Sequence, residues 1–141
     1  MKVYNGQNLI LGRLATVVAK DILLGEQVAV VNCEKIIVSG RKAHSFEHAH
    51  QHFLRKGYPL KSALVSRSPD RFVRRVIRGM IPWKRPRGKE AFHRVMCYIG
   101  VPAEFDGKEM IPVPLASAKK LPTLQFTTIG EICKQVGQKI R

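Results

Sequence analysis

The sequence predicts an α/β fold from three features of its first forty residues. Residues 7–11 form a short extended stretch, residues 13–24 follow a helical pattern of apolar side chains, and residues 28–31 are an unbroken apolar run. A strand, a helix and a second strand within about thirty residues make a βαβ unit, in which the helix crosses between parallel strands. We therefore expect a single α/β domain.

The expected first helix, at residues 13–24, is apolar around most of its circumference. Only Arg13, Thr16 and Lys20 form a narrow polar stripe, and Gly25 is a natural end for the helix. The run at 28–31 has no polar residue, which is typical of a parallel strand covered on both faces. Residues 35–39 predict a further strand that Gly40 ends.

A second helix is expected at residues 41–55, followed by a loop at 58–67. Its apolar residues, Ala43, Phe46 and Ala49 among them, share one side, and three histidines share the other.

Residues 68–94 dominate the rest of the chain because they combine a helix signal with dense positive charge. Ser68 suits the N-cap, Pro69 the first helical position and Asp70 the first turn. At about 100° per residue, the arginines fall in one stripe and the apolar side chains on the opposite side. The stripe is Arg71, Arg74, Arg75 and Arg78; the apolar side is Phe72, Val73, Val76, Ile77 and Met80.

Gly79 and Pro82 end this helix, and a basic loop at 83–89 leads to a short helix that contains Arg94. A last strand is expected at 95–99. The turn-rich residues 103–122 predict an arm along the surface. Thr128 and Glu131 have the spacing of a capping box, which starts a terminal helix. Its apolar side is Ile129, Ile132, Cys133, Val136 and Ile140.

The predicted organisation is one domain with two parts. Residues 1–102 form an α/β core that carries a basic segment at 41–94, and residues 103–141 form the surface arm and terminal helix on the same domain.

Positive charge is concentrated in the middle of the chain. The net charge is +15, and residues 41–94 alone hold fifteen Lys or Arg against three acidic residues. Such concentration predicts a polyanionic partner. Because the basic helix has an apolar side suited to a core, we expect nucleic acid rather than a membrane surface.

Other features predict a soluble intracellular protein. No signal-peptide pattern and no run of about 18 apolar residues is present in the sequence. Cys33, Cys97 and Cys133 are odd in number and widely spaced, which predicts reduced thiols rather than disulfides. Cys33 is expected to pack in the sheet.

Two other functions are compatible with parts of the sequence. His44, Glu47 and His48 match the H-x-x-E-H arrangement of inverted zinc peptidases, with His52, Glu104 or Glu109 as a third ligand. The same histidines also suit RNA contact, since partial protonation adds positive charge. A sequence-specific DNA binder would read bases with mixed Asn, Gln and Arg on its recognition helix, whereas this helix offers arginine alone.

Two separate motifs carry a family resemblance. The first is Gly12-Arg13-Leu14-Ala15 with Val31-Asn32-Cys33-Glu34-Lys35; the second is Ile77-Arg78-Gly79-Met80-Ile81-Pro82 with Gly88-Lys89, Val95, Tyr98 and Gly100. In order and spacing they resemble the L-thirteen family of large-subunit ribosomal proteins. The tail at 112–137 is similar to archaeal-type and eukaryotic-type members, and the absence of a long basic extension makes the chain look archaeal-type. Cys97, in place of a small or β-branched residue, and the histidine cluster depart from the family pattern.

The resemblance implies a three-layer α/β/α domain around a four-stranded, mostly parallel sheet. It implies a structural protein, not an enzyme, that binds large-subunit rRNA during assembly. Its expected setting is the cytoplasmic ribosome, as a monomer beside other large-subunit proteins, with no membrane, cofactor or small-molecule substrate. The residues expected to bind rRNA are Arg13, Lys35, Arg41, Lys42, Arg55, Lys56, Arg67, Arg71, Arg74, Arg75, Arg78, Lys84, Arg85, Arg87, Lys89 and Arg94.

Trp83 within the basic loop is a candidate for stacking on an unpaired base. The alternative is packing against its own domain, which is commoner for a lone aromatic residue beside proline. No metal site is expected beyond the weak candidate formed by His44, His48 and His52.

Overall fold

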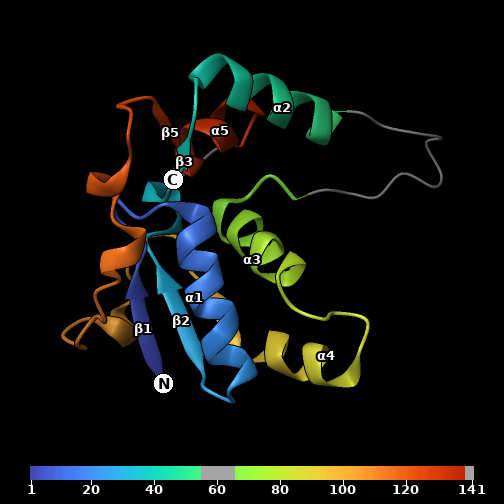
Figure 1. Ribbon diagram of the computed structural model, residues 1–141, viewed down its shortest axis with the longest axis vertical. Coiled ribbons are helices and arrows are strands. Elements are labelled where there is room, and N and C mark those ends of the chain that lie inside the picture. Colours follow the sequence, from blue (N-terminus) through green and yellow to red (C-terminus); the bar gives the residue numbers. More distant parts are fainter. Residues whose placement is uncertain (55–65, 139–141) are drawn as a thin grey trace.

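The computed structural model describes residues 1–54 and 66–138 of the chain, and Figure 1 shows their arrangement. The strands are β1 (Lys2–Asn5), β2 (Val28–Val31), β3 (Ile37–Ser39), β4 (Val95–Cys97) and β5 (Phe126–Thr128). The α-helices are α1 (Leu11–Leu23), α2 (Lys42–Leu54), α3 (Pro69–Gly79), α4 (Pro86–His93) and α5 (Ile129–Gln135). The 3-10 helices are η1 (Cys33–Lys35), η2 (Ala103–Phe105), η3 (Pro114–Ala116) and η4 (Ala118–Lys120).

The main sheet has three parallel strands in the order β1-β2-β4. All four residues of β2 are buried, as its apolar run predicts, and α1 crosses between β1 and β2. The α/β class is therefore confirmed. The expected first strand at 7–11 is wrong: β1 lies at Lys2–Asn5, and Leu9 and Ile10 form only isolated bridges.

A second sheet contains β3 and β5, which pair antiparallel. The expected four-stranded sheet is wrong because the chain leaves the main sheet directly after β2. Asn32 adopts a left-handed conformation with φ of 56°, and η1 turns the chain before β3 begins at Ile37. The strand expected at 35–39 is shortened for the same reason, and β5 was not predicted.

The helices α1, α3 and α4 pack on one face of the main sheet (Figure 1). Leu14, Val18 and Ile77 from these helices share a core with Val28 and Val30 of β2. On the opposite face, Val3, Ala29 and Val31 pack against Phe105 of η2, with Met110 beside them. In the described part of the chain, the short 3-10 helix η2 and the residues after it cover this face, where the expected fold has a layer of α-helices.

The helices α2 and α5 pack together beside the second sheet. Ala49 of α2 joins Ile132 of α5 and Val136, the residue directly after α5, in a separate buried cluster. The cap predicted for α5 is confirmed, since Thr128 Oγ1 accepts a hydrogen bond of 3.2 Å from the backbone N–H of Glu131. Ile140 lies outside the described residues, as do all but two residues of the loop expected at 58–67.

The segment at 103–122 follows the surface as a series of 3-10 turns. Ile111 bridges to Tyr4 of β1, and the backbone N–H of Ile10 donates to the carbonyl oxygen of Ala116 at 2.7 Å. Val113 and Ala116 are buried in the main core. This segment therefore packs on the same body as the sheet.

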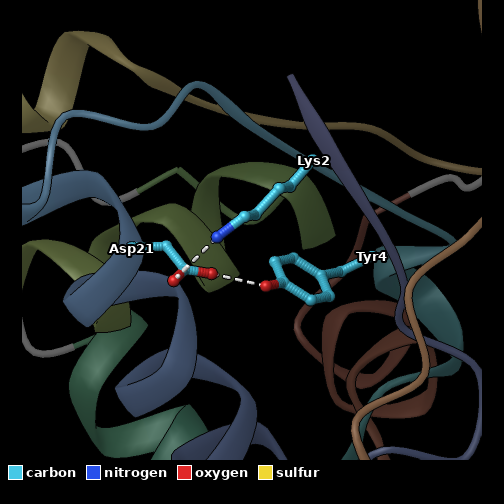
Figure 2. Close-up of polar contacts among 3 residues, drawn as sticks. All are labelled: Lys2, Tyr4 and Asp21. Carbon is cyan, nitrogen blue, oxygen red and sulfur yellow. Dashed lines mark hydrogen bonds and ion pairs between the residues drawn. The ribbon is translucent and has the colours of Figure 1, made fainter.

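A polar contact ties β1 to α1 (Figure 2). The Tyr4 hydroxyl donates to Asp21 Oδ2, and Lys2 Nζ lies 3.3 Å from Asp21 Oδ1. Burial, reinforced by the hydrogen bond to the Asp21 carboxylate, raises the pKa of Tyr4 above its ordinary range. The contact places the first strand relative to the crossover helix.

None of the helices in residues 1–54 and 66–138 has the length and apolar character needed to cross a membrane.

Candidate nucleic-acid interface

The arginines of α3 lie on the side of the helix away from Val73 and Ile77, which are buried. Arg71 and Arg78 are exposed, whereas Arg74 and Arg75 are half-buried. The amphipathic pattern predicted for α3 is present, with one exception. Met80, expected on the apolar side, lies just beyond the last residue of the helix and is 42% exposed.

Arg74 is directed at its own domain. Its guanidinium carbon lies 4.6 Å from the centroid of the Phe92 ring, and its Nη2 donates to the Phe92 carbonyl oxygen at 3.4 Å. Its Nε is buried and has no hydrogen-bond partner in the part of the chain that the structure describes. Arg74 therefore joins α3 to α4.

Trp83 lies in the turn between the two helices and is half-buried. Its ring meets that of Phe92 edge to face, with centroids 4.8 Å apart. The guanidinium of Arg78 lies 5.6 Å from the centroid of the Trp83 ring. The indole thus packs against its own domain and carries an arginine on its face.

The basic loop expected at 83–89 is shorter than predicted, because α4 already begins at Pro86. Lys84 and Arg85 lie in the turn, Arg87 and Lys89 lie on the helix, and all four are exposed. Gly88 is buried against the turn: a Cβ at this position would lie 2.1 Å from the carbonyl oxygen of Pro82. Only glycine allows α4 to pack so closely on the turn.

We call Arg71, Arg75, Arg78, Lys84, Arg85, Arg87 and Lys89 the α3–α4 basic surface. Within the described residues the ion pairs are Lys2 with Asp21 and Lys42 with Glu131. No carboxylate of that part of the chain therefore pairs with a member of the α3–α4 basic surface. Its charge is held on two helices that Arg74 and the aromatic rings of Trp83 and Phe92 fix together.

Other residues expected to bind rRNA lie on different elements. Arg13 at the start of α1 is exposed, and its Nη1 donates to the Leu115 carbonyl oxygen at 3.4 Å. Lys35 in η1 and Arg41 before α2 are exposed. None of these three residues belongs to α3, α4 or the turn between them.

The remaining expected residues are more enclosed or already paired. Lys42 forms its ion pair with Glu131 at 3.3 Å. Arg67 is half-buried, and Arg94 donates from Nη1 to the Ile22 carbonyl oxygen at 3.3 Å. Arg55 and Lys56 lie outside the described residues.

The histidines of α2 form a ladder along one side of the helix. The ring centroids of His44 and His48 are 6.4 Å apart, as are those of His48 and His52. Among the residues that the structure describes, no group of three His, Cys, Asp or Glu side chains is placed to hold a metal ion. The ladder is therefore an exposed row of imidazoles.

All three cysteines are buried free thiols. A hydrogen bond with Cys97 and burial both raise the pKa of Cys33. Burial, together with the nearby Asp70 charge, raises the pKa of Cys133 to about 12. The thiols of Cys33 and Cys133 therefore stay protonated at neutral pH and are poor nucleophiles.

The residue that sequence reasoning missed is Phe92. It contacts both Arg74 and Trp83 and so organises the turn between α3 and α4. Its only sequence signal is an aromatic residue in the short helix after the basic stretch.

The chain is similar to known ribosomal proteins. Residues 1–104 match the family model described as ribosomal protein L13. The chain is 41% identical over 140 residues to the large ribosomal subunit protein uL13 of Methanopyrus kandleri, covering 98% of this chain and 87% of that protein. It is 39% identical over 139 residues to the protein of the same name from Methanococcoides burtonii, covering 99% of both. It is 41% identical over 142 residues to that of Methanococcus maripaludis, again covering 99% of both.

Proposed function

Because the chain belongs to the ribosomal protein L13 family, we propose that it is a structural component of the large ribosomal subunit that binds large-subunit rRNA through the α3–α4 basic surface. Its role is structural and not enzymatic, and its place is the ribosome in the cytoplasm. The three relatives named above are archaeal, in keeping with the archaeal-type tail.

The observation that carries the RNA-binding proposal is the unpaired charge of α3 and α4. Seven basic side chains lie on or between two helices, without a carboxylate partner among the described residues. Such side chains neutralise phosphates and release counterions, which drives binding to nucleic acid. Double-stranded RNA is recognised mainly through shape, phosphates and 2′-hydroxyls, which suits an arginine-rich surface without amide side chains.

The contacts of Arg74 and Trp83 refine their roles. We assign Arg74 to holding α4 in place, since its guanidinium is engaged with Phe92. The indole ring of Trp83 packs against the guanidinium of Arg78, so we do not assign Trp83 to base stacking. We assign to additional rRNA contacts, outside the α3–α4 basic surface, the exposed residues Arg13, Lys35 and Arg41.

We further propose that the chain acts as a monomer among neighbouring large-subunit proteins, without a cofactor, a small-molecule substrate or a membrane.

The test is the salt dependence of rRNA binding by the full-length chain. Each phosphate contact adds about 0.7–0.9 to the slope of log K against log salt. Arg71 and Arg78 are both exposed. Replacing both with glutamine should therefore lower the magnitude of the slope by the amount expected for about two phosphate contacts. The matched control replaces the exposed Lys119 and Lys120 of η4 with glutamine. An unchanged slope in the arginine variant, or an equal fall in the control, would count against this surface.

A further inference from the structure

A groove of about 470 Å³ lies between α2 and α3. We call it the α2–α3 groove. Its apolar wall includes Val38 of β3, Ala49 of α2, Ile132 of α5, and Phe72 and Val76 of α3. Its volume falls in the range of about 300–1,000 Å³ that is typical of sites for small organic groups.

The polar lining of this groove is basic. His44, His48 and His52 line it from α2, and Arg75 lines it from α3. The described lining contains no carboxylate, and its other polar side chains are serines. The groove therefore combines an apolar aromatic wall with donors suited to an anion.

The acidic residues of the surrounding helices are engaged elsewhere. Glu131 of α5 pairs with Lys42, and Glu47 of α2 accepts from Gln51 at 3.3 Å. The Ser68 hydroxyl donates to Asp70 Oδ1 at the start of α3. Arg75 belongs to both the α2–α3 groove and the α3–α4 basic surface, so the two are continuous.

We propose that the α2–α3 groove holds an unpaired nucleotide of the RNA bound by the α3–α4 basic surface, with the base against Phe72 and the imidazoles and the phosphate at Arg75. This inference rests on the proposed function. Proteins that recognise RNA stack splayed-out bases on Phe, His and Arg side chains, all of which line this groove. A helix of a neighbouring protein would be a different occupant, and the basic lining favours the nucleotide.

The first test fills the groove. Ser45 lines it and is half-buried, so Ser45→Phe places a ring in the space without removing charge. The matched control is Ala43→Phe, at an exposed position of α2 that does not line the groove. Fluorescence anisotropy of the full-length chain would use two probes: a single-stranded oligoadenylate and an RNA duplex of the same length. Ser45→Phe should weaken oligoadenylate binding by about tenfold, the order of one lost base stack, and leave duplex binding unchanged. Ala43→Phe should change neither.

A second pair keeps the test decisive if the added ring disturbs folding. His48 lines the groove, whereas His50 is exposed on the same helix and does not line it. His48→Gln should weaken oligoadenylate binding severalfold, and His50→Gln should not.

The outcomes separate the two proposals. If the native chain binds the duplex but not oligoadenylate, or if His48→Gln has no effect, the groove proposal is overturned while the proposed function stands. If the native chain binds neither probe nor rRNA, the proposed function itself fails. Crosslinking within assembled subunits that placed another protein's side chain in the groove would also overturn the nucleotide proposal.

Discussion

The guanidinium of Arg74 lies over the ring of Phe92, with 4.6 Å between its central carbon and the ring centroid. A residue from the predicted arginine stripe therefore joins two helices of its own domain. The same side chain donates to the Phe92 carbonyl oxygen, so α4 is held by both a ring contact and a hydrogen bond. The α3–α4 basic surface depends on this junction for its shape.

The first prediction concerns this junction. Arg74→Gln removes the cation–π contact and should lower the free energy of unfolding by about 1 kcal/mol. Arg71→Gln is the control, because Arg71 is exposed and its replacement should change stability by less than about 0.5 kcal/mol. Urea unfolding of both variants gives the comparison. Equal stability of the two would show that Arg74 does not hold α4.

A second prediction concerns the close approach of α4 to the turn before it. In Gly88→Ala, the new Cβ would meet the carbonyl of Pro82, and backbone cannot move aside as a side chain can. We expect a loss of about 1–3 kcal/mol. The fluorescence of Trp83, the single tryptophan of the chain, should also change because it lies in the same turn.

Gly79→Ala is the matched control. Nothing lies within 4 Å of a Cβ at Gly79, so this variant should be as stable as the native chain or slightly more stable. A Gly88→Ala variant of native stability would mean that the turn and α4 are not in contact.

The third prediction is a pH dependence. The pKa of Tyr4 is raised in the folded state by burial and by the Asp21 carboxylate, whereas in the unfolded chain it is about 10. Above that pH the unfolded state loses the tyrosine proton first. The contribution of Tyr4 to the free energy of unfolding should therefore be fully present and independent of pH below pH of about 10, and should fall by about 1.4 kcal/mol per pH unit above it.

Tyr4→Phe isolates this contribution. The variant should lose about 1–2 kcal/mol near neutral pH, since Asp21 keeps only Lys2 as a side-chain partner. Its stability should then decline less steeply than that of the native chain in alkaline solution. Parallel slopes for the two proteins in urea unfolding above pH of about 10 would contradict the assignment to Tyr4.

A fourth prediction concerns the thiols. Cys33, Cys97 and Cys133 are buried, and the raised pKa of Cys133, about 12, leaves little thiolate in mildly alkaline solution. A thiol reagent should label the native chain slowly and the unfolded chain at all three positions at once. Fast labelling of the native chain, read by mass spectrometry, would contradict their burial.

Much of the helical structure could be predicted from local pattern. The apolar side of α3 contains the buried Val73 and Ile77, and the Thr128 cap opens α5. These signals lie within a few residues of one another, so a sequence window contains all the information that they need.

The sheets could not be predicted in the same way. β1 and β5 have four and three residues, which is too short for a clear alternation, and their pairing depends on partners far along the chain. The left-handed backbone conformation of Asn32 then directs β3 away from the main sheet. The presence of an asparagine in the sequence is not enough to predict that conformation.

The concentration of charge predicts the basic surface, but it does not predict which of the arginines contacts its own domain. Periodicity places Arg74 in the same stripe as Arg71 and Arg78, while its aromatic partner lies 18 residues later. A long side chain such as that of Arg74 can point into solvent or fold back onto its own domain, and the packing of α4 determines which orientation it takes. The assignment of the expected rRNA-binding residues to RNA contact stays a prediction.

The measurement that tests the central claim most directly is ultraviolet crosslinking of assembled large subunits, with crosslinked peptides identified by mass spectrometry. We expect rRNA crosslinks in peptides of α3, the turn and α4, including those with Arg78 and Arg85, which are exposed. Crosslinks confined to the segment with η3 and η4, with α3 and α4 free of RNA, would contradict the account.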